Sequence, residues 1–348
     1  MNSTSRPDTS TAEHYLHNWV PAIGVIETLQ MSEQGYRDSF QLDARIRTAG
    51  TAPSRYELTT LEPFFREQPS RMAPIIFHTG HCGSTLLSRV LSGSPNILPV
   101  REPMPLWQLA DNFAVLDHST RLLNREQWNL AARVLLYSYS RTFGDHQTAL
   151  IKATSTSNNL IVPLIKNKLL KRAVLLYQPL ISHLAATLRA AKPSDDLRSQ
   201  AVPRMREWMK IPGAPSLYVS DLSPGQLSVV SWLSSMVLML EALEQYPGYC
   251  QLQNFNYFLA DPEKCVSRIS EFLGFASESA SLLESLPGVL SRNSKITTKA
   301  FSASDRQRKH AEVIDTKADQ VANAMGWAEE LIRDVAAFSK CHDYLRDH

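Results

Sequence analysis

The sequence predicts an α/β protein built on a doubly wound parallel sheet flanked by helices, and three of its features point to this fold. A short apolar run, 75–77, is bounded like a buried strand and leads into a loop with two glycines. Apolar residues at helical spacing follow over 86–91. Two later segments, 148–159 and 171–189, again place an apolar strand before a polar cluster or a turn. Such strand–turn–helix units are typical of α/β proteins.

The α/β domain is expected to span 73–348, after an N-terminal extension. Residues 1–13 are polar and rich in Ser and Thr, which predicts a disordered tail without a secretory signal and therefore a cytoplasmic protein. Residues 14–72 are predicted to form a helical extension packed on or beside the domain. The proline-punctuated segment 193–224 is predicted to be a lid or insertion, which is a natural place for specificity.

The loop after the first core strand has the composition of an anion-binding turn. Gly80 and Gly83 allow positive φ and close approach of the backbone to a ligand. A helix that begins near Gly83 would direct its free N–H groups over the loop, and Ser84 and Thr85 add hydroxyl donors there. The loop lacks the Gly-Lys-Ser/Thr ending of a nucleoside triphosphatase, so simple hydrolysis of ATP or GTP is disfavoured. The alternative is an ordinary strand-to-helix turn.

At His81-Cys-Gly-Ser-Thr-Leu-Leu87 the chain resembles the phosphosulfate loop of the sulfotransferase family, as a divergent member with a P-loop-like fold. The resemblance implies that the loop binds the 5′-phosphosulfate of 3′-phosphoadenosine 5′-phosphosulfate (PAPS) and needs no metal. The residues it assigns to this donor are Thr79, Gly80, His81, Cys82, Gly83, Ser84 and Thr85. His81 departs from the family, because it replaces a fixed cation with a group whose charge depends on pH near neutrality.

The segment 91–103 resembles the part of tyrosylprotein and related Golgi-type sulfotransferases that ends in a catalytic glutamate. Glu102 is the matching residue, seventeen positions after Thr85. Sulfonyl transfer needs a base that takes the proton of the acceptor, and a carboxylate near the mouth of the loop can serve. The alternative is that Glu102 only pairs with Arg101 or Lys152 at the surface.

The strand end at 148–159 resembles the Lys-Thr-His or Lys-Thr-Pro strand end of the family. Lys152 matches the lysine that neutralises the sulfonate and the bridging oxygen, and preorganised charge of this kind lowers a transfer barrier. Thr154 stands where cytosolic members carry a catalytic histidine, which moves the assignment of the base to Glu102. We expect His81 to join Lys152 in stabilising the leaving phosphate. A solvated lysine at a strand end is the alternative.

The residues at the positions that bind the 3′-phosphate of the donor differ most from the family pattern. Gln178 occupies the position of an arginine, and Ala186 that of a serine, with Ser182 and Thr187 as the nearest hydroxyls. Charge-assisted bonds to phosphate are about twice as strong as neutral ones. The cations that could compensate are Arg172, Arg189, Arg292, Lys295 and Lys299, of which the last three lie on or beside a segment that resembles the family's basic loop over the nucleotide.

Composition limits the other ligands and partners. The net charge of +2 gives no reason to expect nucleic acid. Four cysteines and ten histidines show no metal-like or disulfide spacing, and Cys82 is interpreted as a small loop residue in preference to a redox-active thiol. The apolar segment 229–243 is predicted to be a buried helix, so no membrane partner is expected. A small molecule or a peptide is the expected acceptor, and a homodimer is left open.

The sequence thus predicts a sulfotransferase that moves a sulfonyl group from PAPS to a hydroxyl or amine acceptor. A second reading is a non-catalytic nucleotide- or anion-binding module on the same scaffold, because His81, Gln178 and Ala186 all depart from the donor pattern. A third reading, an ATP-dependent phosphotransferase, is disfavoured because the loop carries no lysine of the nucleoside triphosphatase type.

Overall fold

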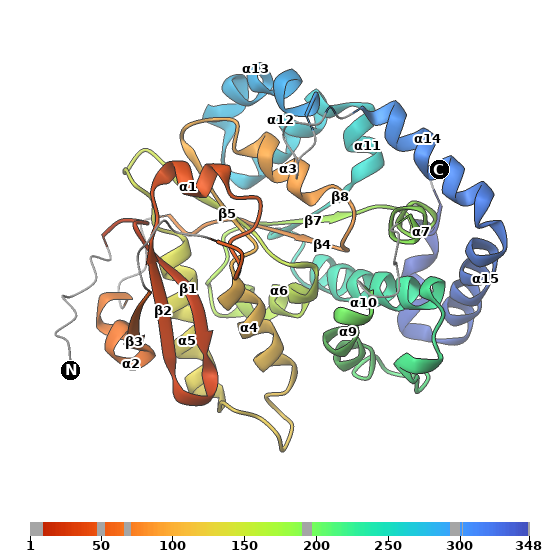
Figure 1. The fold of residues 1–348 in the computed structure, drawn as a ribbon, viewed down its shortest axis with the longest axis horizontal. Coiled ribbons are helices and arrows are strands. Elements are labelled where there is room, and N and C mark those ends of the chain that lie inside the picture. The colour runs from red at the N-terminus through yellow and green to blue at the C-terminus, as the bar shows by residue number, and fades with distance from the viewer. Residues whose placement is uncertain are drawn as a thin grey trace.

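A five-stranded parallel sheet forms the centre of the computed structural model, which describes residues 10–46, 53–65, 71–189, 197–292, 300 and 302–346. The strand order is β5-β6-β4-β7-β8 (Figure 1). The strands are β4 (Ile75–His78), β5 (Ile97–Arg101), β6 (Thr148–Lys152), β7 (Ala173–Tyr177) and β8 (Cys250–Asn254). The chain passes from the central β4 to β5 on one side and later crosses to β7 on the other. This confirms the predicted doubly wound α/β fold.

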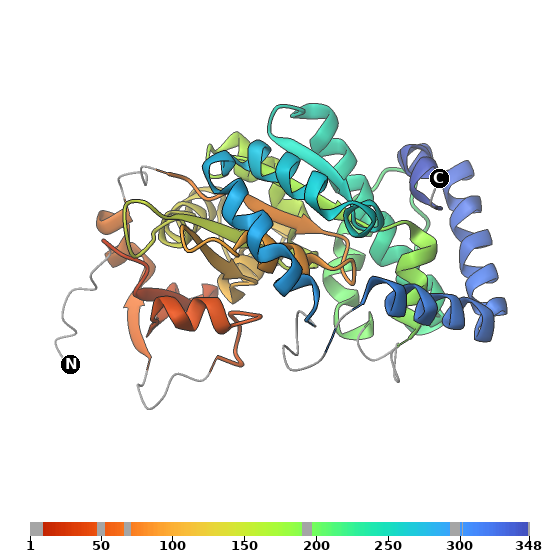
Figure 2. The ribbon, with the colours of Figure 1, turned by 90° about the horizontal axis from the view of Figure 1, so that it is seen from above.

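Helices cover both faces of the sheet. Successive side chains of a strand point to opposite sides, so the apolar strands present side chains for packing on both faces. Ile76, Leu150 and Val174 pack with α3 (Ser84–Leu91), α12 (Pro262–Leu273) and α13 (Ser279–Leu290) on one face. Figure 2 views the ribbon from this side, with the blue helices of the segment 262–290 in front of the sheet. Phe77 and Ile151 belong to the larger core on the other face. The helices of this larger core and of the C-terminal part are α4 (Met104–Ala114), α5 (Arg125–Tyr139), α6 (Ile161–Lys166), α7 (Leu180–Leu188), α9 (Ala201–Trp208), α10 (Pro224–Gln245), α11 (Phe255–Ala260), α14 (Ala303–Thr316) and α15 (Ala318–Asp334).

The long helix α10 begins at a capping box, in which Ser223 accepts a bond from the Gln226 N–H and the Gln226 side chain bonds back. Within the described part of the chain, α10 is the one helix long and apolar enough to cross a membrane, and 72% of its most apolar window is buried inside the protein. It contacts α7, α9, α15 and β8. The predicted buried helix is therefore confirmed.

The N-terminal extension differs from the prediction. It contains two short helices, α1 (Glu33–Asp38) and α2 (Leu58–Leu61), but its main element is an antiparallel sheet of β1 (His14–Val20), β2 (Val25–Gln30) and β3 (Ser54–Glu57). Gly24, at φ +65°, makes the turn between the first two strands. Tyr15, Leu16 and Trp19 of β1 are buried in the main core, and the Tyr139 hydroxyl donates to the Leu16 carbonyl at 2.8 Å. Burial against α4 and α5 therefore overrides the predicted helical state.

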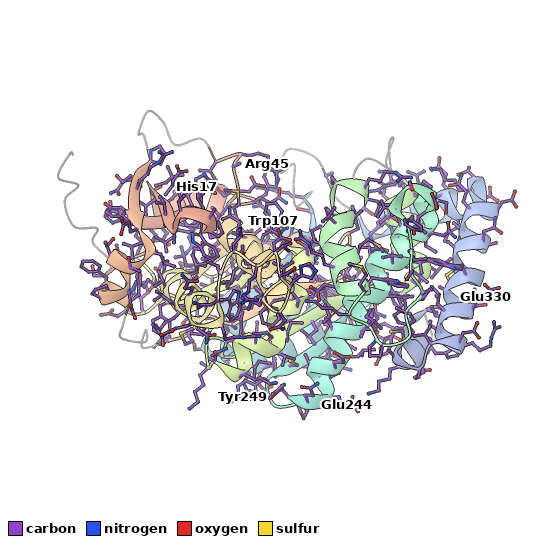
Figure 3. The ribbon with its side chains drawn as sticks, turned by 90° about the horizontal axis from the view of Figure 1, so that it is seen from below. His17, Arg45, Trp107, Glu244, Tyr249 and Glu330 are labelled. Atoms are coloured by element: carbon purple, nitrogen blue, oxygen red, sulfur yellow. The ribbon has the colours of Figure 1, made fainter. Side chains whose placement is uncertain are left out.

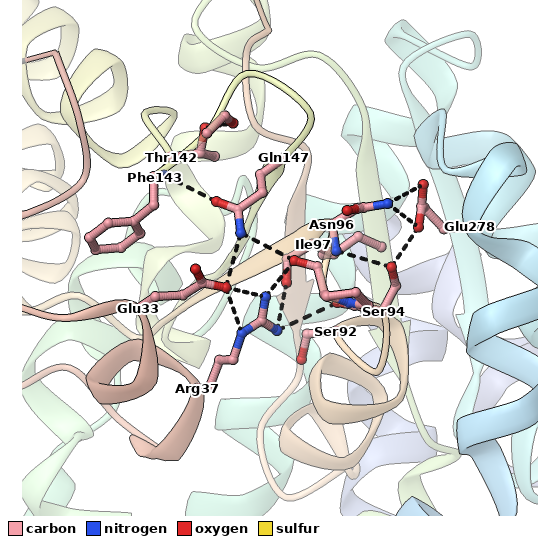
Figure 4. Close-up of polar contacts among 12 residues, drawn as sticks. Glu33, Arg37, Ser92, Ser94, Asn96, Ile97, Thr142, Phe143, Gln147 and Glu278 are labelled. Carbon is pink, nitrogen blue, oxygen red and sulfur yellow. Dashed lines mark hydrogen bonds and ion pairs between the residues drawn. The ribbon is translucent and has the colours of Figure 1, made fainter.

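A polar network fixes α1 to the start of β5 (Figure 4). Arg37 pairs with Glu33 at 2.7 Å and donates to the Pro95 carbonyl at 2.6 Å. Gln147 donates to the same glutamate at 2.9 Å. At the other end of β5, the Leu42 N–H donates to the Arg101 carbonyl at 2.7 Å. The segment that follows α1 is thereby held across the carboxyl end of β5.

Candidate functional site

Three residues of the loop between β4 and α3 have positive φ. These are Gly80 at +84°, His81 at +52° and Gly83 at +74°. Positive φ costs a non-glycine residue energy, so the conformation of His81 is held by its surroundings. The helix α3 begins at Ser84, and the N–H groups of its first turn have no partners within the helix. These N–H groups face the loop, as does the positive end of the helix dipole. The loop thus has positive φ at both glycines and a helix that begins at Ser84, which is the backbone geometry on which the prediction of anion binding depends.

His78, the last residue of β4, ties this loop to the neighbouring strand β6. Its Nδ1 accepts the Gly80 N–H at 3.1 Å, and its Nε2 donates to the Ala153 carbonyl at 3.0 Å. Burial and the nearby charge of Lys152 hold the pKa of His78 well below its ordinary value of 6.5, so the ring is neutral. Sequence reasoning missed this role, although a histidine at the end of a buried strand was a visible signal.

Glu102 and Lys152 meet at the carboxyl ends of the adjacent strands β5 and β6. Arg101 and Lys152 are register partners, and the Glu102 N–H donates to the Lys152 carbonyl at 2.6 Å. The Lys152 ammonium pairs directly with Glu102 Oε1, and the exposed fractions of these side chains are 1% and 14%. Glu102 has φ +51°, a second strained non-glycine residue. Lys152 is therefore buried at the sheet edge and Glu102 is partly exposed, whereas Arg101 turns away to bond the Ser39 carbonyl at 2.8 Å.

A cavity of about 660 Å³ lies over the loop and the strand ends. It is lined by residues of the loop, by Glu102, by residues 154–156 after β6, and by the aromatic rings of Phe40 and Trp107. Three arginines also line it, Arg45, Arg189 and Arg306. Figure 3 labels Arg45 and Trp107, which come from the segment after α1 and from α4. Among the lining residues that the structure describes, Glu102 is the one carboxylate, so the cavity suits an anionic ligand.

Arg306 of α14 places a guanidinium against Gln178. Its Nη2 donates to Gln178 Oε1 at 2.6 Å, and its Nη1 donates to Asn256 Oδ1 at 3.1 Å. Gln178 Nε2 donates in turn to the His81 carbonyl at 3.3 Å, and Asn256 Nδ2 donates to Ser182 Oγ at 3.0 Å. Gln178, at the position compared above with an arginine of sulfotransferases, is therefore contacted by an arginine from a helix 128 residues away in sequence. Sequence reasoning missed Arg306, because no local motif surrounds it.

Some of the other predicted donor residues lie at the cavity, and others lie away from it. Ala186 and Arg189 of α7 line the cavity. Thr187 is buried and bonds Ser228 Oγ at 2.8 Å. Arg172 lies at the opposite end of β7, where it donates to the Gly248 carbonyl at 2.8 Å.

The predicted basic loop can be placed only in part. Arg292 lines a separate pocket together with Arg37, Arg89 and Arg101. Lys295 and Lys299 lie outside the described residues.

Cys82 is a packed residue of the loop. Its side chain is buried, and its Sγ donates to the Leu176 carbonyl at 3.5 Å. Burial raises the pKa of the Cys82 thiol, which opposes a reactive thiolate. Within the described chain, no group of three His, Cys, Asp or Glu side chains could hold a metal ion.

We expect the free energy of unfolding to fall by about 4 kcal/mol from pH 7.5 to pH 5.5 because of buried histidines. Burial lowers the pKa of His78 and His183 well below 6.5, and that of His310 to about 3. The unfolded chain therefore binds more protons below pH 6.5, and stability is lost as the pH falls. Urea titrations across this range would measure the loss, and His310→Leu should remove about a third of it. A total below about 1.5 kcal/mol would contradict three neutral buried rings.

No protein-family model matches the chain, and no curated protein matches it in sequence. Solved structures are similar to it in fold. The sulfotransferase domain from the curacin biosynthetic pathway has a TM-score of 0.41 and 13% identity, over 72% of this chain and 99% of that one. Sulfotransferase STF9 from Mycobacterium avium has a TM-score of 0.36 and 14% identity, over 73% of this chain and 79% of that one. The sulfotransferase domain from the Synechococcus PCC 7002 olefin synthase has 0.37 and 14%, over 72% and 98%. The likeness is distant and concerns the fold alone.

Proposed function

We propose that this protein transfers a sulfonyl group from PAPS to a hydroxyl or amine of a small-molecule or peptide acceptor. The observation that carries the proposal is the Glu102–Lys152 pair at the mouth of the loop. A module that only binds a nucleotide has no need of a base beside the phosphate loop, and a cavity with three arginines and one carboxylate in its lining suits a donor with several negative charges.

Each group has a defined role in this reaction. The N–H groups of the loop and of the first turn of α3 hold the 5′-phosphosulfate. Lys152 leaves Glu102 for the oxygen that bridges sulfur and phosphorus, and Glu102 takes the proton of the acceptor. A new bond forms from the acceptor oxygen or nitrogen to sulfur as the bond from sulfur to the bridging oxygen breaks. The leaving group is adenosine 3′,5′-bisphosphate, whose new negative charge Lys152 neutralises.

The 3′-phosphate is assigned to Arg306. The Arg306 side chain lines the cavity, and its hydrogen bonds to Gln178 and Asn256 support this assignment because they hold it at the end of β7. Arg306→Ala should therefore weaken binding of adenosine 3′,5′-bisphosphate by about tenfold or more and leave binding of AMP almost unchanged, since charge-assisted bonds to phosphate are lost. Calorimetric titration would measure both. The matched control is Arg308→Ala on the same helix, an exposed arginine paired with Asp305. Equal loss for the two nucleotides would contradict the assignment.

The proposed function is tested by incubating the protein with ³⁵S-labelled PAPS and a panel consisting of a phenol, a hexose, an alkylamine and water alone. We expect release of adenosine 3′,5′-bisphosphate together with labelled product from at least one acceptor. Tight binding of the nucleotide without turnover in any arm would instead support the non-catalytic module. Magnesium-dependent consumption of ATP in a parallel arm would support the phosphotransferase.

A further inference from the structure

The segment 40–45 of the N-terminal extension forms a wall of the catalytic cavity. The Leu42 N–H donates to the Arg101 carbonyl at 2.7 Å, and the Leu42 carbonyl accepts the Met104 N–H at 3.2 Å. These two main-chain bonds lie on either side of Glu102. Phe40, Gln41 and Arg45 of the segment line the cavity beside that carboxylate. The extension is thus part of the site and not an appendage to it.

The two oxygens of Glu102 have different partners. Oε1 receives the Lys152 ammonium, and Oε2 receives the Gln41 amide Nε2 at 2.5 Å. In the proposed function Lys152 turns to the donor, which leaves Oε1 available for the proton of the acceptor. Gln41 can keep its bond to Oε2 through this exchange. The main chain of Glu102, at φ +51°, is held by its hydrogen bond to the neighbouring strand. The Glu102 side-chain torsions therefore need a separate contact to fix them, and the Gln41 amide provides one.

We propose that Gln41 is a positioning residue that orients the Glu102 carboxylate for proton abstraction, so that the N-terminal extension completes the catalytic site. This inference rests on the proposed function. Because the amide is neutral, it anchors the carboxylate without the charge of a second lysine. Its donated hydrogen bond fixes Oε2, so that Oε1 is the oxygen left to take the proton of the acceptor.

Other polar groups also surround Glu102. The charged ones are Lys152 from β6 and Arg45 from the segment after α1, and Arg45 is itself paired with Asp43 at 2.5 Å. The loop contributes His81 to the same cavity, and α4 contributes Trp107. Removing the Gln41 amide leaves all of these side chains in place, so its effect on kcat can be separated from theirs.

The test uses Gln41→Ala and Gln41→Glu in the full chain, with Gln34→Ala as the matched control. Gln34 is an exposed glutamine of α1 that bonds Asp38 at 2.8 Å, away from the cavity. With PAPS and the best acceptor of the panel, we expect Gln41→Ala to lower kcat about tenfold or more, with the KM for PAPS within about twofold. Gln41→Glu should lower kcat at least as much, because a second carboxylate cannot donate the hydrogen bond and repels the first. The dissociation constant for adenosine 3′,5′-bisphosphate should stay within about twofold.

A purely structural role would have a different signature, namely a lowered melting temperature and kcat together with weaker binding of adenosine 3′,5′-bisphosphate, and that result would overturn the inference. An active wild-type protein beside an unaltered Gln41→Ala variant would overturn it as well, and would leave the proposed function intact. If the wild-type protein transfers no sulfonyl group in any arm, the proposed function fails, and this inference fails with it.

Discussion

Glu102→Gln is expected to lower the rate of sulfonyl transfer by about 10²- to 10⁴-fold, which is the range for loss of a general base. The amide can still accept a bond from Lys152 and occupies the same space, so the strand ends and the loop should keep their places. Binding of adenosine 3′,5′-bisphosphate should therefore change little. Single-turnover kinetics with labelled PAPS would measure the chemical step, and calorimetry would measure the binding.

The control for this variant is Glu62→Gln, which removes the charge of another partly exposed glutamate. Glu62 lies in the N-terminal extension and pairs with Arg133 of α5 at 2.8 Å. It should transfer at the wild-type rate. Breaking a buried ion pair also costs stability, so the melting temperature of Glu102→Gln must be shown to lie above the assay temperature. A folded Glu102→Gln protein that transfers at the wild-type rate would exclude Glu102 as the base.

Gly83→Ala is expected to destabilise the fold by about 3 kcal/mol or more and to abolish nucleotide binding. A Cβ at this position would lie 2.0 Å from the ring of Phe255, and φ is +74°. The ring cannot easily move, because it stacks on Phe258 with ring centroids 5.8 Å apart. The Arg306 guanidinium also lies over it, with Cζ 5.1 Å from the ring centroid. Urea unfolding would measure the loss. Gly248→Ala is the matched control, since nothing lies within 4 Å of its Cβ position.

A double variant separates the two causes of this loss. Phe255→Ala removes the ring that a Cβ on Gly83 would meet, but it does not change φ. In the Phe255→Ala background, Gly83→Ala should therefore cost only the strain of positive φ, about 1–3 kcal/mol. Neighbouring residues that share a contact are expected to show such an interaction energy. Additive losses would mean that the ring and the glycine are not in contact, contrary to the geometry described above.

The parts of the site that sequence could predict are those encoded by neighbouring residues. An apolar strand, two glycines and a helical repeat specify the loop, since each of them acts through local backbone conformation. Lys152 could be placed because a residue at the end of a parallel strand reaches the same sheet edge as the loop. The sheet order then brings Lys152 beside Glu102, as β5 and β6 pair in register.

The parts that sequence could not predict depend on contacts between distant segments. Arg306 reaches Gln178 over 128 residues, and Gln41 reaches Glu102 over 61. Neither has a local pattern that distinguishes it from a solvated side chain. The antiparallel sheet of the extension was missed for a related reason, because β1 is stabilised by burial of Tyr15 and Trp19 against α5 and α4 and not by a strong strand signal of its own.

The central claim, that the cavity over the loop binds a 3′-phosphorylated adenosine nucleotide, is tested most directly by calorimetric titration of the protein with adenosine 3′,5′-bisphosphate beside AMP. We predict micromolar binding of the bisphosphate, about −8 kcal/mol, and clearly weaker binding of AMP. Equal affinities for the two nucleotides, or no binding of either, would contradict the account.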